Sequence, residues 1–379
     1  MKKRILNVLI TLLIFACLIG FFYINNLNYI KNIQLKNQIV IHPELLPNKQ
    51  TAKYTSFGFS NLRADIYWLE TIQYIGGNAI SSDYKKYLYS MLDLITELNP
   101  FFEKPYLIGQ LLLPNYNERY ENLSLEERQI NNSQAEKIGL KGIVNFCDEK
   151  KINLIKDEND LSKIWTDEKY KNPCKTANIP FSQAFLYYYY LKNPLASANF
   201  YKVSSANTDG LEGSKIMAAI MSGKAGNRER SIMMFLTLAD SLKKKDDKVC
   251  EYFSNELQRI SFQIFRNSKD LTGGIIKNIQ FARDKNFKFD EKKEQEIVSG
   301  DNCENYINKA IRELNLEFLE RANKKYFDKN KTNAINAKIL YEKGFIDFLP
   351  TDFQQYKDYG IIYIFDKESG NFDYEMGNY

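Results

Sequence analysis

Residues 94–113 read LITELNPFFEKPYLIGQLLL and contain the helix-breaking signal that decides the fold. A first apolar segment ends at Asn99, because the residue before a proline is biased away from helical backbone. A second apolar segment follows Pro100 and carries a glycine, Gly109, near its middle. Two helices joined by a short turn have this pattern, so the stretch predicts a helical hairpin.

Helical periodicity continues on the N-terminal side of this stretch. Residues 59–77 carry apolar side chains at helical spacing and end at a Gly-Gly pair, which predicts an amphipathic helix. Residues 83–98 predict the next helix, with Asp83 as its N-cap residue. The side chains expected to face the core are Leu62, Ile66, Leu69, Ile72 and Tyr74 in the first helix and Leu88, Met91, Leu92 and Ile95 in the second.

A helix-turn-helix unit recurs further along the chain. One copy begins at Ser182 and the next at Ser214, and each has an asparagine at its turn, Asn193 and Asn227. The spacing of the two turns is close to the period of roughly 34 residues that is typical of tetratricopeptide repeats. Residues 56–328 are therefore expected to form stacked helical hairpins, with an insertion near 145–176 that breaks the period.

The junction at residues 97–113 resembles the boundary between consecutive tetratricopeptide repeats. Pro100 would close one hairpin, Tyr106 would be the aromatic residue of the next helix, and Gly109 would be the small residue where helices cross closely. Further small residues occur at such positions: Ala135, Gly139, Ala218, Ala219 and Gly223. The resemblance extends over residues 59–245 and implies a mainly α-helical, tetratricopeptide-like solenoid.

The first hairpin also resembles that of a group of membrane-anchored bacterial envelope proteins with the pattern ADxxWLxxIQYxG. The matching residues are Ala64, Asp65, Trp68, Leu69, Ile72, Gln73, Tyr74 and Gly76. This resemblance implies a scaffold and supplies no activity.

Residues 329–379 differ in kind from the helical part. A short helix is expected around residues 334–343, and alternating apolar residues on both sides of a turn at 367–370 predict a β-hairpin. The tail resembles the end of the major pseudopilins of type II secretion, although Phe353 and Gln355 stand where that family has proline and glycine. The resemblance implies a small C-terminal α/β docking module.

The N-terminus predicts a membrane anchor at residues 1–24. Three cationic residues precede an apolar run at residues 5–24, which is long enough to span a bilayer and favours a cytoplasmic N-terminus with the bulk of the chain outside. A cleaved signal peptide and a lipoprotein modified at Cys17 are the alternatives. Residues 25–55 would then be a juxtamembrane linker, with one short strand at residues 38–41.

Four cysteines lie outside the predicted anchor. In an extracytoplasmic compartment, nearest-neighbour pairing would join Cys147 to Cys174 and Cys250 to Cys303, and free core thiols are the alternative. No CxxC spacing occurs and His42 is the only histidine, so no metal site is expected. With one histidine in the linker, no catalytic triad and no cofactor site are expected either.

A partner-binding groove is the functional site that the pattern favours. Net charge is +5 from 52 basic and 47 acidic side chains, and three of the basic ones flank the predicted anchor, so the charge gives no case for nucleic-acid binding. Four consecutive tyrosines point in every direction around their helix, so some could line a groove, although filling the core is the alternative. The groove residues expected are Tyr187, Tyr188, Tyr190, Asn227 and Arg228.

Together these patterns favour a non-enzymatic scaffold or assembly factor anchored in the cell membrane. Its partners would be other envelope proteins or peptides, such as those of a pilus or a secretion apparatus. One alternative is an envelope polysaccharide or peptidoglycan hydrolase that acts through two carboxylates on a helical solenoid. Another is a structural subunit of a filament, which the large helical body disfavours.

Overall fold

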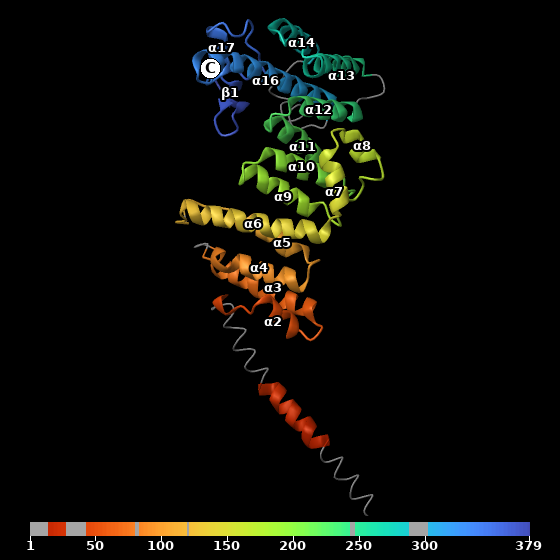
Figure 1. The fold of residues 1–379 in the computed structure, drawn as a ribbon, viewed down its shortest axis with the longest axis vertical. Coiled ribbons are helices and arrows are strands. Elements are labelled where there is room, and N and C mark those ends of the chain that lie inside the picture. The colour runs from red at the N-terminus through yellow and green to blue at the C-terminus, as the bar shows by residue number, and fades with distance from the viewer. Residues whose placement is uncertain (1–13, 28–42, 80–82, 120, 243–246, 288–301) are drawn as a thin grey trace, which may run out of the picture. The chain divides into compact units, whose positions relative to one another are not determined.

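The computed structural model describes residues 14–27, 43–79, 83–119, 121–242, 247–287 and 302–379. These residues confirm a mainly α-helical protein with one small two-stranded antiparallel sheet, which is drawn in blue in Figure 1. The chain divides into two compact units, residues 1–145 and residues 146–379, here called the N-terminal unit and the C-terminal unit. Each unit is described by itself.

The N-terminal unit consists mainly of helices in its described residues. The labelled elements are η1 (Pro43–Leu45), α2 (Lys49–Tyr54), α3 (Ser60–Gly77), α4 (Lys85–Leu98), α5 (Glu103–Leu112) and α6 (Leu125–Phe146), whose last residue belongs to the next unit. A further helix covers residues 14–27. None of the helices in the described ranges is both long and apolar enough to cross a membrane.

The turn predicted at Asn99 and Pro100 is present, because α4 ends at Leu98 and α5 begins at Glu103. The Tyr106 hydroxyl donates a hydrogen bond back to the Pro100 carbonyl over 2.9 Å, which ties the new helix to the turn. A Cβ at Gly109 would lie 2.7 Å from the Ile138 side chain. The glycine therefore lets α5 and α6 approach closely.

The predicted inward face of α3 is wrong. Leu62, Ile66, Leu69 and Ile72 are 58%, 37%, 63% and 43% exposed. The opposite face packs against α4, with Ala64 and Tyr67 in contact with a cluster from α2 and α4. Both faces of α3 carry apolar residues at helical spacing, so periodicity alone could not choose between them. Of the five predicted residues, only Tyr74 is buried.

The neighbouring helix α4 buries its predicted side chains, because Leu88, Met91, Leu92 and Ile95 are at most 3% exposed. The predicted cap is wrong by one residue, since α4 begins at Lys85 and Tyr84 is its N-cap residue.

Part of the predicted linker is helical. The Asn48 side chain accepts a hydrogen bond from the Thr51 backbone N–H over 2.8 Å and so starts α2. The strand expected at residues 38–41 lies outside the described residues, as do His42 and residues 1–13 of the predicted anchor.

The C-terminal unit is built mainly of further helices. They are α7 (Glu149–Asp157), α8 (Leu161–Thr166), α9 (Asn178–Tyr189), α10 (Pro194–Ser205), α11 (Glu212–Lys224), α12 (Arg228–Leu242), α13 (Lys248–Ser261), η2 (Phe262–Arg266), α14 (Gly273–Asn286), α16 (Cys303–Asn330) and α17 (Ala337–Glu342). The two segments that the sequence predicts as repeats form the packed helix pairs α9 with α10 and α11 with α12. Asn193 caps α10 by accepting from the Ala196 backbone N–H over 3.0 Å, and Asn227 directly precedes α12.

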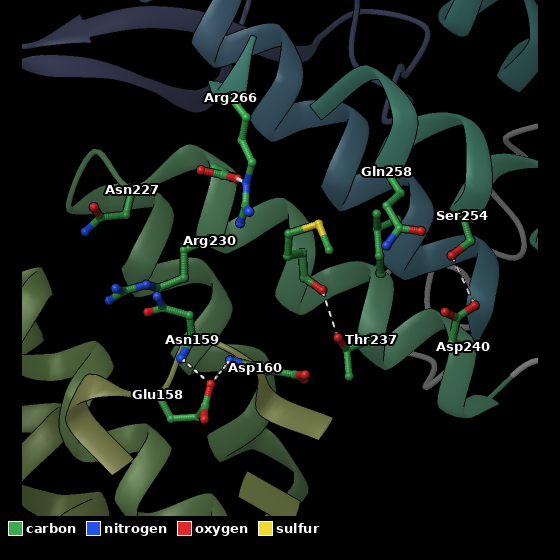
Figure 2. Close-up of a pocket in the computed structure, with 13 residues that line it drawn as sticks. Glu158, Asn159, Asp160, Asn227, Arg230, Thr237, Asp240, Ser254, Gln258 and Arg266 are labelled. Carbon is green, nitrogen blue, oxygen red and sulfur yellow. Dashed lines mark hydrogen bonds and ion pairs between the residues drawn. The ribbon is translucent and has the colours of Figure 1, made fainter. Parts of the chain in front are cut away.

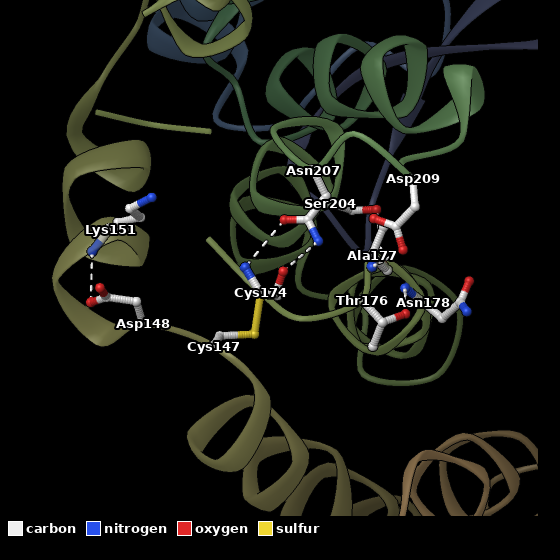
Figure 3. The surroundings of a disulfide bond; sticks show 10 residues. All are labelled: Cys147, Asp148, Lys151, Cys174, Thr176, Ala177, Asn178, Ser204, Asn207 and Asp209. Carbon is white, nitrogen blue, oxygen red and sulfur yellow. Dashed lines mark hydrogen bonds between the residues drawn. A yellow bond between two sulfur atoms is a disulfide. The ribbon is translucent and has the colours of Figure 1, made fainter. Parts of the chain in front are cut away.

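Helices α7 and α8 form the predicted insertion, and a disulfide between Cys147 and Cys174 closes it at its base (Figure 3). The two cysteines also form an isolated antiparallel bridge. The Asn207 side chain accepts from the Cys174 backbone N–H and donates to the Cys174 carbonyl, over 3.2 and 2.9 Å. The insertion is therefore held against the end of α10. A second disulfide joins Cys250 at the start of α13 to Cys303 at the start of α16.

The predicted β-hairpin is present as β1 (Gly360–Asp366) and β2 (Asn371–Gly377), with Gly370 in the left-handed region at φ +73°. The outer edge of β1 is covered, because the backbone N–H groups of Ile361, Tyr363 and Phe365 donate to the Gln354 carbonyl, the Tyr379 hydroxyl and the Ile335 carbonyl. At the outer edge of β2, the Phe372 carbonyl accepts from Arg228 over 2.6 Å. Such covered edges disfavour pairing with a further strand.

A buried ionic network joins the hairpin to α16. Arg312 donates to both carboxylate oxygens of Asp352 over 2.7 and 2.8 Å and to the Gln354 side chain over 2.6 Å. The Tyr363 hydroxyl donates to Asp352 over 3.1 Å and accepts from Asn315 over 2.9 Å. Asp352, Gln354 and Tyr363 therefore join residues 329–379 to the core of the C-terminal unit.

Candidate functional site

A cleft of about 470 Å³ opens in the C-terminal unit between α12, α13, η2 and the turn at residues 158–160 (Figure 2). Its lining is mainly polar and carries side chains of both charges. The charged ones are Glu158, Asp160, Glu229, Asp240, Arg230 and Arg266. The local structure decides which of these charges are available to a ligand.

The turn at residues 158–160 forms one wall of the cleft and is held by its own carboxylates. Glu158 accepts from the backbone N–H groups of Asn159 and Asp160 over 2.9 and 3.0 Å and from the Tyr170 hydroxyl over 2.8 Å. The backbone N–H of Asp160 and the Tyr170 hydroxyl hold the pKa of Glu158 below its ordinary value. Asp160 caps α8 by accepting from the Ser162 backbone N–H over 2.9 Å. Both carboxylates thus stabilise the turn.

The side chain of a buried lysine, Lys202, binds the backbone of this turn. The Lys202 side chain is 0% exposed, and its Nζ donates to the carbonyls of Lys156 and Glu158 over 2.7 and 3.0 Å. Burial, with a smaller effect from the nearby Arg230 cation, lowers the pKa of Lys202 to about 7. A neutral amine keeps two N–H groups, so both hydrogen bonds can persist after the proton is lost.

We expect the stability of the C-terminal unit to increase from about pH 7 to about pH 9. The folded pKa of Lys202 is lowered while its unfolded value is ordinary, so in this window the unfolded chain binds more protons and the free energy of unfolding rises with pH. The rise should be on the order of 2 to 3 kcal/mol. Urea unfolding at both pH values measures it, and Lys202→Met should flatten the dependence. An unchanged slope in Lys202→Met would contradict this assignment.

The opposite wall of the cleft contains an ion pair, a hydrogen-bonded aspartate and one arginine whose guanidinium has no partner among the described residues. Arg266 forms an ion pair with Glu229 over 3.2 Å, and the Ser254 hydroxyl donates to Asp240 over 3.1 Å. Arg230 is half-buried and has neither a hydrogen bond nor an ion pair with any residue that the structure describes. Among the described residues of the cleft, its guanidinium is therefore a charged group that a ligand can engage without breaking an existing pair.

The predicted groove residues are not brought together. Tyr187 is buried and stacks on Phe200 at 5.6 Å, as the core-filling alternative expects. Arg228 is 2% exposed and pairs with Glu313 and Glu320 over 2.8 and 2.6 Å, so it offers no surface to a ligand. Burial disfavours the charged form of Glu313 and Glu320. It raises the pKa of both carboxyl groups, although Arg228 acts in the opposite direction.

The other three predicted residues lie in separate places. Tyr188 lines a second cleft of about 600 Å³ beside the ion pair of Lys224 and Asp373. The ring of Tyr190 contacts that of Tyr189 at 4.9 Å in an aromatic cluster at the end of α9. Asn227 is the one predicted residue that lines the cleft of Figure 2. The sequence did not predict Arg230, whose guanidinium has no described partner, although it lies two positions after Arg228 in the same helix.

A potential metal-ligand group exists among the described residues, at Asp247, Cys250 and Cys303. Both sulfurs are joined in a disulfide, so neither is a thiolate that could bind a metal ion. The group is therefore part of a covalent cross-link.

No protein-family model, curated protein or solved structure matches the chain. The likenesses to tetratricopeptide repeats and to pseudopilins accordingly stay predictions. The function must be argued from the geometry of the cleft.

Proposed function

We propose that this chain is a non-enzymatic scaffold or assembly factor that binds an envelope protein or peptide in the cleft of the C-terminal unit. The observation that supports it is the open guanidinium of Arg230 in a cleft whose other arginine is already paired. The apolar residues 5–24 would hold the scaffold in the membrane with its bulk outside the cytoplasm. Components of a pilus or secretion apparatus are the partners proposed.

The chemistry of the cleft indicates what it binds. A planar guanidinium binds a carboxylate through two parallel hydrogen bonds, so Arg230 fits an acidic side chain or a peptide carboxyl terminus. The amides of Asn227 and Gln258 can each donate and accept, which suits the backbone of an extended peptide. Stacked helical hairpins offer such peptides a continuous surface.

The hydrolase alternative needs a carboxylic acid with a raised pKa that faces a second carboxylate across a groove. In the cleft, the pKa of Glu158 is lowered by hydrogen bonds that hold the turn. Glu313 and Glu320 have raised pKa values, but both bind Arg228 at the core side of α12. The geometry therefore favours binding over glycoside cleavage.

The test is photo-crosslinking in cells with p-benzoylphenylalanine in place of Gln258, which lines the cleft and is exposed. We expect a discrete protein adduct whose yield falls at least about tenfold in Arg230→Glu, since a charge-assisted hydrogen bond contributes about 1.5 to 3 kcal/mol. Arg259→Glu is the matched control, because Arg259 is an exposed arginine of α13 that pairs with Glu256. It should leave the yield unchanged.

A second control places the crosslinker at Tyr252, which is 53% exposed on α13 but does not line the cleft. The same adduct from both positions, or an adduct that Arg230→Glu does not weaken, would contradict the proposed site. Cleavage of peptidoglycan or polysaccharide by the purified chain would favour the hydrolase instead.

A further inference from the structure

The two disulfides that the structure describes differ in how far solvent reaches their cysteines. Cys147 is half-buried and its partner Cys174 is 7% exposed, whereas Cys250 and Cys303 are 1% and 6% exposed. Thiol–disulfide exchange needs a thiolate to reach one of the two sulfurs, and a fully buried disulfide becomes reachable only by local unfolding. Of the two, the bond between Cys147 and Cys174 is therefore expected to react first.

This more accessible bond closes the insertion that supplies one wall of the cleft. Residues 147–174 contain α7, α8 and the turn at residues 158–160, which lines the cleft. The disulfide ties the two ends of this segment together (Figure 3). A cross-link restricts the conformations open to the chain between its cysteines. Without it, the insertion keeps only noncovalent contacts to the rest of the unit.

Hydrogen bonds at the base of the insertion would hold the cysteines in register after reduction. The backbone N–H of Asp148 donates to the Pro173 carbonyl over 2.7 Å, and Asn207 binds both backbone groups of Cys174. Such bonds break and re-form in the folded protein, whereas the disulfide stays closed. They allow the insertion to open and still return the sulfur of Cys147 to its partner, so that the same pair can form again.

We propose that the Cys147–Cys174 disulfide is a redox switch that controls the cleft wall formed by the turn at residues 158–160. In the oxidised protein the insertion is closed and the wall is fixed. In the reduced protein α7 and α8 open and close together with the turn, so the wall is no longer held in place. The switch acts on the cleft itself and does not depend on which ligand the cleft binds.

The reductant is a dithiol, such as the reduced active site of a thiol–disulfide oxidoreductase. Its first thiolate attacks Sγ of Cys147 and forms a mixed disulfide, while the bond to Cys174 breaks and the Cys174 thiolate takes a proton from water. The second thiolate of the reductant then attacks its own sulfur in the mixed disulfide and releases Cys147, which is protonated in the same way. In total, two electrons and two protons pass from the dithiol to the protein.

Trp165 of α8 reports whether the insertion is closed. Its Nε1–H donates to the Ser205 hydroxyl over 3.3 Å, and the Lys215 ammonium lies 4.9 Å from the centroid of its ring. Both partners belong to helices outside the insertion, α10 and α11. When the insertion opens, the ring loses both contacts and enters water, so its fluorescence emission should shift to longer wavelength. A Trp68→Phe background removes the other tryptophan.

The test titrates the full chain in phosphatidylcholine vesicles with dithiothreitol and labels free thiols with N-ethylmaleimide for mass spectrometry. We expect labels on Cys147 and Cys174 at a dithiothreitol concentration at least about tenfold lower than on Cys250 and Cys303. The emission of Trp165 should shift over the same range as the first pair of labels appears. Oxidised glutathione should reverse the shift.

The other disulfide provides the matched control. The Cys250→Ala, Cys303→Ala double variant should keep the shift, whereas the Cys147→Ala, Cys174→Ala double variant should emit at the longer wavelength without reductant and not respond to it. Labels that reach Cys250 and Cys303 first or together with the other pair, or an unshifted emission once Cys147 and Cys174 are labelled, would overturn the proposal. The wild-type titration needs neither variant, and it uses no cleft ligand, so its failure leaves the Arg230 experiment standing.

Discussion

Replacing Asp352 with alanine is expected to lower the free energy of unfolding of the C-terminal unit by about 3 to 5 kcal/mol. The change leaves the Arg312 guanidinium, which is 6% exposed, without its carboxylate in the core. It also removes an acceptor of the Tyr363 hydroxyl. An uncompensated buried charge costs far more than the net stability of the intact pair, so the loss should exceed that of any surface ion pair.

Denaturant unfolding followed by tryptophan fluorescence measures this effect. The chain has two tryptophans, Trp68 in the N-terminal unit and Trp165 in the C-terminal unit, so a Trp68→Phe background reports the C-terminal unit alone. Asp328→Ala, at an exposed position of α16, is the control and should change stability by less than about 0.5 kcal/mol. A loss below about 1 kcal/mol for Asp352→Ala would show that Arg312 finds another partner.

The pH dependence of the pair has a definite sign. Burial alone would raise the pKa of Asp352, but Arg312 outweighs it and holds that pKa below its ordinary value. The contribution of Asp352 is therefore complete above the ordinary value for an aspartate and is lost as the pH falls through the lowered folded value. Acid unfolding of the wild type should accordingly steepen in this range.

Removing the disulfide between Cys250 and Cys303 is the second change with a large expected effect. The bond joins residues separated by 53 positions, and the chain-entropy relation gives about 4 kcal/mol for a loop of this size. Both sulfurs are buried, so alanine at both positions leaves little polar mismatch. The double variant should unfold at lower denaturant concentration than the wild type under oxidising conditions.

Two controls test this assignment, a reducing agent and a variant at a cysteine outside the disulfide. A reducing agent should lower the stability of the wild type toward that of the Cys250→Ala, Cys303→Ala double variant and should have less effect on the variant itself. Cys17→Ser should change nothing, because Cys17 is exposed and free. Equal stability of wild type and double variant in the absence of reductant would contradict the assignment.

Local patterns predicted those elements whose signals lie within a few residues. The hairpin β1–β2 follows from alternation and a glycine turn, and the α4–α5 turn follows from Asn99 and Pro100. The orientation of α3 could not be predicted, because it depends on which of two apolar faces meets α4. The Arg312 network could not be predicted either, because its members come from segments about 40 residues apart and many other charged residues could have paired.

The sequence alone also could not show which of two arginines in α12 lines the cleft. Successive residues of a helix are rotated by about 100°, so Arg228 and Arg230 point in nearly opposite directions. One face of α12 meets α16, which takes Arg228 into the core, and the other lines the cleft. Nothing in the sequence RERS distinguishes the two arginines until the packing of α12 is known.

Lys224 at the end of α11 and Arg228 at the start of α12 bind partners that are synthesised much later. Arg228 finds its acceptor on Phe372 across 144 residues, and Lys224 finds Asp373 across 149. A ribosome produces α11 and α12 well before those acceptors exist, so during synthesis both cations lack their final partners. A chain that ends before residue 360 has both helices but lacks the hairpin, so Lys224 loses Asp373 and Arg228 loses the Phe372 carbonyl.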